Sequence, residues 1–279
     1  MASEPTQLNR DQRKKKGTAA PLVQAYLVAY NLLSAAGWSL VLYQTLAHLF
    51  GAPQQPPQHD SLLATIKASA TPPFVWVPSL LPASLAPLYT RACTTYDAVG
   101  TTTARVQTAA ALEVFHVLLG LVRSPLPTTT VQVASRLFSV WAIAARFPSA
   151  QRSPFYASMV LSWALTEVVR YAFYAATLLG NGSAPAPLTW VRYSTFFVLY
   201  PTGAGSEALV NLATLPVSLA RSGAWWDALP LAHWDAYAIA RGVLFIAWWP
   251  GLYPMYTHMI KQRRKMFGGQ KLGAKPKTH

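Results

Sequence analysis

The feature that most constrains this chain is the length of its apolar stretches. Several runs of about 20 mostly apolar residues alternate with polar breaks, and about 20 helical residues cross a hydrocarbon layer ~30 Å thick. Only 11% of the 279 residues are charged, whereas an ordinary soluble domain has roughly 25%. The first stretch, Leu22 to Phe50, is too long for the core of a signal peptide and indicates a retained span. The pattern predicts an integral membrane protein built from helices.

Six membrane spans are predicted, so the fold class is all-α and polytopic. Their approximate limits are residues 21–49, 107–122, 128–145, 155–179, 188–215 and 236–260. The segment 51–104, between the first two spans, is rich in proline, which removes backbone donors that lipid cannot replace. We therefore expect this segment to be a long interfacial or extended loop on the lumenal side.

Basic residues crowd both ends of the chain and set the topology. The positive-inside rule puts such flanks in the cytoplasm, and two cytoplasmic termini require an even number of crossings, which six satisfies. The predicted organisation is a basic tail over residues 1–20, a membrane domain over residues 21–262 and a second basic tail over residues 263–279. These tails explain the net charge of +14, and because no basic and aromatic groove lies between them, nucleic-acid binding is not expected.

Ionisable residues within spans are expensive and indicate function by default. Three glutamates and three arginines are singled out on this ground: Glu113, Arg136, Glu167, Arg170, Arg192 and Glu207. Glu167 and Arg170 are three residues apart on one helical face, which favours a buried ion pair over a catalytic role. Glu113 and His116 form a single E-x-x-H pair, which favours a structural polar cluster or a lining of the site over a di-iron centre. Cys93 is the only cysteine, which excludes an internal disulfide and a thiolate metal site.

The stretch YPTGAGSE, residues 200–207, holds the most unusual pair of polar residues. Tyr200 and Glu207 are seven residues apart, and seven steps of about 100° return a helical side chain to within about 20° of its first direction. Both groups can therefore face one cavity, at most about 10.5 Å apart along an ideal helix axis. Pro201 removes a backbone hydrogen bond, and Gly203 and Gly205 let the helix bend and approach other groups closely.

This pair suggests proton transfer. Tyrosine has a reference pKa of about 10, so it stays protonated and can donate, while a glutamate carboxylate can accept a proton. An acid and a base beside an apolar cavity suit the elimination of water, in which the base takes a proton next to a carbonyl and the acid protonates the departing hydroxyl. The alternative is structural: a kinked helix whose Glu207 forms an ion pair with Arg136 or Arg192. The residues alone leave both open.

Several motifs, in order along the chain, resemble one known family. LYPTGAGSE, preceded by LTWVRYSTFFV, is similar to the signature of the very-long-chain (3R)-3-hydroxyacyl-CoA dehydratases, formerly called protein tyrosine phosphatase-like proteins. The other predicted spans carry further resembling motifs: YNLLSAAGW, LEVFHVLLGLVRSP, QVASRLFSVW, SWALTEVVRYAFY and YPMYTHMIKQRRK. The proline-rich segment 51–104 departs from the family pattern.

The resemblance implies an activity and a site. The family's catalytic tyrosine and glutamate correspond to Tyr200 and Glu207, and its reaction dehydrates a 3-hydroxyacyl-CoA to a trans-2-enoyl-CoA, the third step of fatty-acid elongation in the endoplasmic reticulum. We therefore expect a multi-pass endoplasmic reticulum enzyme with no metal or redox cofactor, an acyl-CoA substrate and other elongation enzymes as partners. Glu207 is our preferred base and Tyr200 our preferred acid, and the reverse assignment is open. Arg123 and Arg192 are the cations considered for the CoA phosphates.

Two other classes of function compete with this interpretation. A non-catalytic membrane scaffold of the same fold would need the packing but not the chemistry of Glu207, so Glu207→Gln separates it from an enzyme. A proton-coupled transporter would also use glutamates within spans, but we predict one broken helix where inverted repeats would give a pair.

Overall fold

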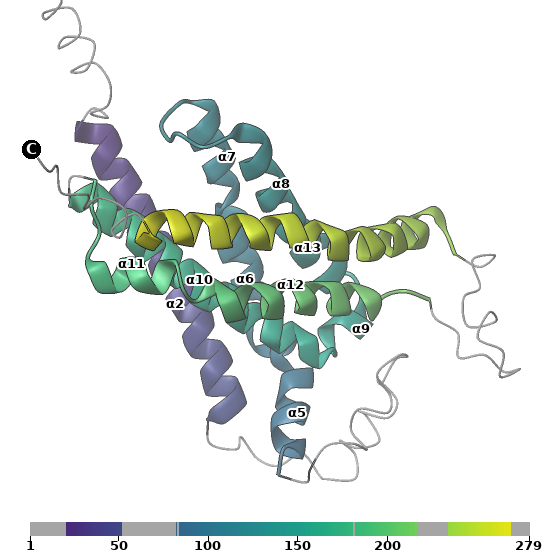
Figure 1. The fold of residues 1–279 in the computed structure, drawn as a ribbon. Helices are drawn as coiled ribbons and strands as arrows, with labels where there is room; N and C mark the ends of the chain where they lie inside the picture. The colour runs from purple at the N-terminus through teal and green to yellow at the C-terminus, as the bar shows by residue number, and fades with distance from the viewer. Residues whose placement is uncertain (1–20, 52–81, 83, 181, 217–233, 269–279) are drawn as a thin grey trace, which may run out of the picture.

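The computed structural model of the protein describes residues 21–51, 82, 84–180, 182–216 and 234–268 (Figure 1). Within these residues the regular structure is helical and contains no strand, which confirms the all-α class. The elements are α2 (Pro21–Phe50), α5 (Ala86–Cys93), α6 (Thr95–Ala109), α7 (Ala111–Leu118), α8 (Leu126–Leu137), the π-helix η1 (Phe138–Ala144), α9 (Pro148–Gln151), α10 (Pro154–Leu179), α11 (Ala186–Arg192), α12 (Phe196–Leu212) and α13 (Ala236–Gly268). The predicted tail 1–20 and most of the predicted tail 263–279 lie outside the described residues.

The longer helices are arranged around α10. Figure 1 shows α12 and α13 side by side and running in opposite directions, while α10 packs against both α12 and α2. α2 packs in turn against α6. α10 is therefore the central helix, and its neighbours on either side carry the parts of the site.

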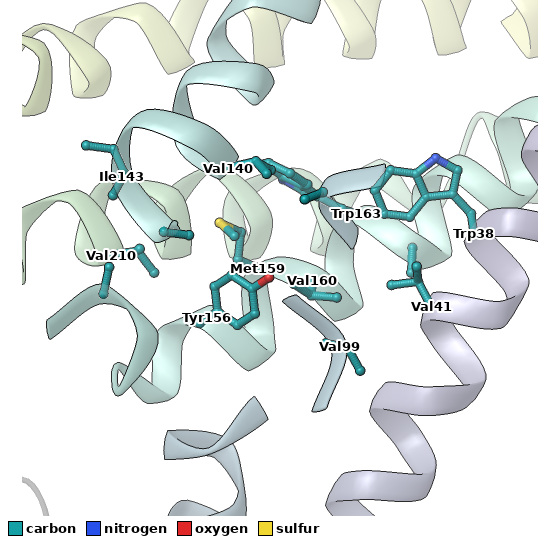
Figure 2. Close-up of a cluster of buried hydrophobic side chains, with 14 of the residues drawn as sticks. Trp38, Val41, Val99, Val140, Ile143, Tyr156, Met159, Val160, Trp163 and Val210 are labelled. Atoms are coloured by element: carbon teal, nitrogen blue, oxygen red, sulfur yellow. The ribbon is translucent and has the colours of Figure 1, made fainter. Parts of the chain in front are cut away.

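The apolar core forms where α10 meets these neighbours (Figure 2). α10 presents large side chains spaced three or four residues apart, among them Tyr156, Met159, Val160 and Trp163. They join a cluster from α2, α6, η1 and α12: Trp38, Val41, Val99, Val140, Ile143 and Val210. If these helices lie in a bilayer, as the sequence predicts, lipid is as apolar as their side chains, so the hydrophobic effect gives little drive for helix association. Close van der Waals packing of the kind seen in this cluster would then hold the helices together.

Residues 86–109 differ from the sequence-based expectation. The predicted loop 51–104 is wrong over its last part, because α5 and α6 occupy residues 86–93 and 95–109, while residues 52–81 lie outside the described residues. Every fourth residue of α6 is buried: Thr95, Val99, Thr103 and Gln107. The threonines and the glutamine hide this buried stripe from a search for apolar residues, and the prolines that suggested a loop end at Pro87.

One described helix is by itself long and apolar enough to cross a membrane, namely α2 with 30 residues. Several other predicted spans are divided into shorter helices: α6 and α7 have 15 and 8 residues, α8 has 12, and α12 has 17. α10 extends over residues 154–179, close to the predicted span 155–179, and α13 extends beyond the predicted end at residue 260. The helical class is thus confirmed, and the number of spans stays a prediction.

Candidate active site

Tyr200 and Glu207 lie on α12, which continues as an α-helix across Pro201. Proline lacks one backbone donor, which weakens the helix locally. Nearby, Thr202 Oγ1 donates a hydrogen bond to the Val198 carbonyl at 2.8 Å. The proline-glycine run therefore leaves the helical course intact, and the two side chains sit two turns apart on one helix.

Two pairs of hydroxyl groups hold α12 against α10. The side-chain oxygens of Ser158 and Ser206 are 2.6 Å apart, and those of Ser162 and Thr202 are 3.0 Å apart. The two hydroxyl pairs are one turn apart on each helix, and their residues run in opposite order along α10 and α12. They therefore fix the register of two antiparallel helices. A Cβ at Gly203 would lie 3.2 Å from the Ser162 Cβ, which confirms a close approach of the two helices at this glycine.

The Glu207 carboxylate accepts a hydrogen bond from Trp163 of α10, with Nε1 2.6 Å from Oε1. Among the described residues it forms no ion pair, because Arg136 is paired with Glu167 and Arg192 has no acidic partner. The structural alternative, an ion pair of Glu207 with one of these two arginines, is therefore wrong. A longer-range electrostatic interaction between Glu207 and Arg136 remains.

Glu207 also lines a small cavity between α12, α13, α10 and η1. The cavity has a volume of about 20 Å³, which is room for about one water molecule. Its walls are mainly apolar and include Met159, Leu244, Phe245 and Trp248, and Glu207 is the only ionisable residue in them. A carboxylate that faces an apolar space without a cationic partner is suited to act as a base on a ligand bound there.

Tyr200 is half-buried, and its ring stacks on Tyr256 of α13 with centroids 6.2 Å apart and planes 21° apart. Its hydroxyl makes no hydrogen bond to any residue that the structure describes, so it is free to donate to a ligand. The hydroxyl interacts electrostatically with Glu207. The structure thus brings the predicted acid and base within electrostatic range, although Tyr200 is outside the lining of the cavity.

Most of the other predicted charges form one network across α7, α8 and α10, in which Glu167 is buried and the other charged members are partly buried. Arg170 Nε donates to Glu167 at 2.6 Å, which confirms the ion pair predicted from their spacing. The two terminal nitrogens of Arg170 donate to both oxygens of Glu113 at 3.0 and 2.7 Å. Arg136 bonds the other oxygen of Glu167, and Tyr171 donates to Glu113. Two glutamates and two arginines cancel in charge, so the network joins three helices without burying a net charge.

His116, the other member of the E-x-x-H pair, makes a separate contact. Its Nε2 lies 2.8 Å from the Tyr26 hydroxyl, and its ring packs edge-on against Tyr30 at 4.7 Å between centroids. These contacts join α7 to α2 and fit the structural polar cluster that the sequence favoured.

Two residues of this region were not predicted from the sequence. Trp163 is one of ten tryptophans, and although it lies in the resembling motif SWALTEVVRYAFY, no role was predicted for it. Arg241 of α13 is 4% exposed and donates to the carbonyl and hydroxyl oxygens of Thr214, just beyond α12, at 2.5 and 2.6 Å. Asn211 of α12 donates back to the Arg241 carbonyl at 3.0 Å. The signal that could have identified Arg241 is its position within the predicted sixth span.

Comparisons with known proteins agree with the resemblance. The family model described as "Protein tyrosine phosphatase-like protein, PTPLA" matches residues 107–269. A Schizosaccharomyces pombe protein named probable very-long-chain (3R)-3-hydroxyacyl-CoA dehydratase is 47% identical over 162 residues. The aligned residues cover 58% of this chain and 71% of the yeast protein. The Caenorhabditis elegans very-long-chain (3R)-3-hydroxyacyl-CoA dehydratase hpo-8 is 32% identical over 252 residues, 88% of this chain and 96% of its own. The Homo sapiens very-long-chain (3R)-3-hydroxyacyl-CoA dehydratase 2 is 32% identical over 249 residues, 88% and 82% of the two chains.

No solved structure matches the chain. The family model nevertheless covers more than half of it, and relatives more than 30% identical align with most of its length. The chain therefore belongs to the protein tyrosine phosphatase-like family, in which these relatives are named very-long-chain (3R)-3-hydroxyacyl-CoA dehydratases.

Proposed function

We propose that the protein dehydrates very-long-chain (3R)-3-hydroxyacyl-CoA to trans-2-enoyl-CoA, the third step of fatty-acid elongation. The observation that carries the proposal is the setting of Glu207, which has no cationic partner among the described residues and faces an apolar cavity. Tyr200, whose hydroxyl bonds no residue in the described part of the chain, lies two turns away on the same helix. The names of the relatives support the same reaction.

The reaction removes one proton and supplies another. Glu207 takes the proton from C2, next to the thioester carbonyl, and the electrons of that C–H bond form the C2–C3 double bond. The C3 hydroxyl leaves with the Tyr200 proton as water. A proton then returns from Glu207 to Tyr200, so the enzyme is restored and no net proton is consumed. The reverse assignment of acid and base is the alternative mechanism.

We also propose that the chain crosses the endoplasmic reticulum membrane six times with both termini in the cytoplasm. The basic end of α13 supports a cytoplasmic rim near α11. Arg263 Nε lies 3.4 Å from the Ser194 hydroxyl, and its guanidinium lies 5.3 Å from the centre of the Phe197 ring. Ser194 is two residues beyond Arg192, the last residue of α11. We propose that these cations, with Arg123, attract the CoA phosphates, and that other elongation enzymes are partners.

The direct test is dehydration of a long-chain (3R)-3-hydroxyacyl-CoA by the purified, detergent-solubilised protein. We expect the wild type to form enoyl-CoA, and folded Tyr200→Phe and Glu207→Gln variants to lose about 100-fold or more of the rate. Tyr253→Phe is the matched control, because this tyrosine of α13 is 74% exposed. A folded but inactive wild type, or variants as active as the wild type, would favour the non-catalytic scaffold.

A further inference from the structure

Trp163 is the only described hydrogen-bond donor to Glu207. Its indole is 2% exposed, and its Nε1 is 2.6 Å from Glu207 Oε1. An indole N–H can only donate, so this contact fixes one carboxylate oxygen as an acceptor. The other oxygen, Oε2, accepts no hydrogen bond from a described residue and is the one left for a substrate proton.

The indole is held on its other side by the charge network. The Arg136 guanidinium lies 5.1 Å from the centre of the Trp163 ring, a distance typical of a cation–π contact. Arg136 is itself fixed by Glu167, which Arg170 also binds. Trp163 therefore lies between the charge network of α7, α8 and α10 and the carboxylate on α12.

The register of α10 against α12 also holds Trp163 opposite Glu207. The hydroxyl pairs Ser158–Ser206 and Ser162–Thr202 involve residues directly before Trp163 and Glu207 in the sequence. Figure 2 shows Trp163 within the packed core, beside Trp38 of α2. An indole confined by packing, by a cation and by a fixed helix register has one orientation in which to offer its N–H.

We propose that Trp163 is a positioning residue for the reaction: its N–H holds Glu207 so that Oε2 is presented to the substrate, and the Arg136–Glu167–Arg170–Glu113 network holds the indole. This proposal rests on the proposed dehydratase function. It assigns to the charge network a role in the geometry of the base in addition to its role in joining helices.

The first test is Trp163→Phe, which keeps an aromatic ring and removes the N–H. Loss of a hydrogen bond to a charged group predicts a fall in kcat of about 10- to 100-fold. KM for the acyl-CoA is expected to stay within about twofold of the wild type, since the indole holds the base rather than the substrate. Trp38→Phe is the matched control: Trp38 is 1% exposed, its ring lies 6.5 Å from that of Trp163, and its N–H bonds no described residue.

The second test places Trp163→Phe in the Glu207→Gln background. If Trp163 acts only through Glu207, the double variant has the rate of Glu207→Gln alone, because effects through one group are not additive. Equal kcat losses in Trp38→Phe and Trp163→Phe, an unchanged kcat in Trp163→Phe, or a further loss in the double variant would each overturn the positioning role while the dehydratase function stands. A folded wild type without dehydratase activity would overturn both.

Discussion

The two glycines of the YPTGAGSE stretch have different neighbours, which makes them a matched pair for testing the approach of α10 to α12. A Cβ on Gly203 would lie 3.2 Å from the Ser162 Cβ, whereas a Cβ on Gly205 would have no neighbour within 4 Å. The close approach predicted for both glycines thus occurs at Gly203 only. Both lie inside α12, where alanine stabilises a helix by about 1 kcal/mol relative to glycine. Gly205→Ala is therefore expected to raise the free energy of unfolding by about that amount.

Gly203→Ala has the same helical gain, but it must also displace Ser162. That side chain is bonded to Thr202 and cannot move away freely, so overpacking is expected to cost about 1–3 kcal/mol. The net change is between zero and about 2 kcal/mol of destabilisation, and the two variants differ by about 1–3 kcal/mol. Thermal unfolding of the solubilised protein, followed by tryptophan fluorescence, measures this difference at about 2–4 °C per kcal/mol. Equal Tm shifts for the two alanine variants would refute the close packing of α10 on α12 at Gly203.

Three further predictions follow from the buried polar contacts and the proposed topology. Arg170→Met leaves Glu113 without a cation and Glu167 with Arg136 alone, and it is expected to destabilise the protein by about 3–5 kcal/mol. Arg152→Met breaks a pair with Asp97 in which the side chains are 40% and 55% exposed, so it should cost at most about 1 kcal/mol. Similar Tm losses for the two variants would contradict the network. Arg241→Met removes the charged donor to the chain beyond α12 and should lower the free energy of unfolding by about 1.5–3 kcal/mol, and a wild-type Tm would show that this contact does not hold α12. Asn181 lies outside the described residues and begins a glycosylation sequon, which the six-span topology places on the cytoplasmic side, so it should remain unmodified in endoplasmic reticulum vesicles. A sequon introduced into the predicted lumenal loop should be glycosylated. A glycosidase-sensitive mobility shift of the native chain would exclude the six-span topology.

How far the fold could be predicted depends on whether the buried face of each helix is apolar. α10 was located to within a residue because Pro154 and Gly180 bound a long, mostly apolar run. α6 was missed because three of the four residues on its buried stripe are threonine or glutamine. Such a stripe is recognisable only once a partner helix is known to pack against it.

The same limit applies to the polar contacts. The Glu167–Arg170 pair was predictable because both members lie within one turn, and local spacing determines their separation. The further bonds of this pair to Glu113 and Arg136 depend on how α7 and α8 pack on α10. The spacing of residues along the chain does not determine that packing. For Glu207 the sequence suggested arginine partners, whereas the structure provides Trp163.

If Glu207 is the base, its difference from the other two glutamates of the predicted spans has a chemical reason. Glu113 and Glu167, the other carboxylates in the predicted spans, both bind arginine. A base must become protonated in each catalytic cycle, and a carboxylate paired with a buried arginine would then leave that cation without its partner. Breaking a buried ion pair costs about 3–5 kcal/mol, which would add to the barrier at every turnover. A neutral indole donor avoids this cost, because protonation of Glu207 weakens a single hydrogen bond. By binding Arg136, Glu167 keeps this guanidinium from pairing with Glu207, the proposed base, whose carboxylate is then free to change its protonation state.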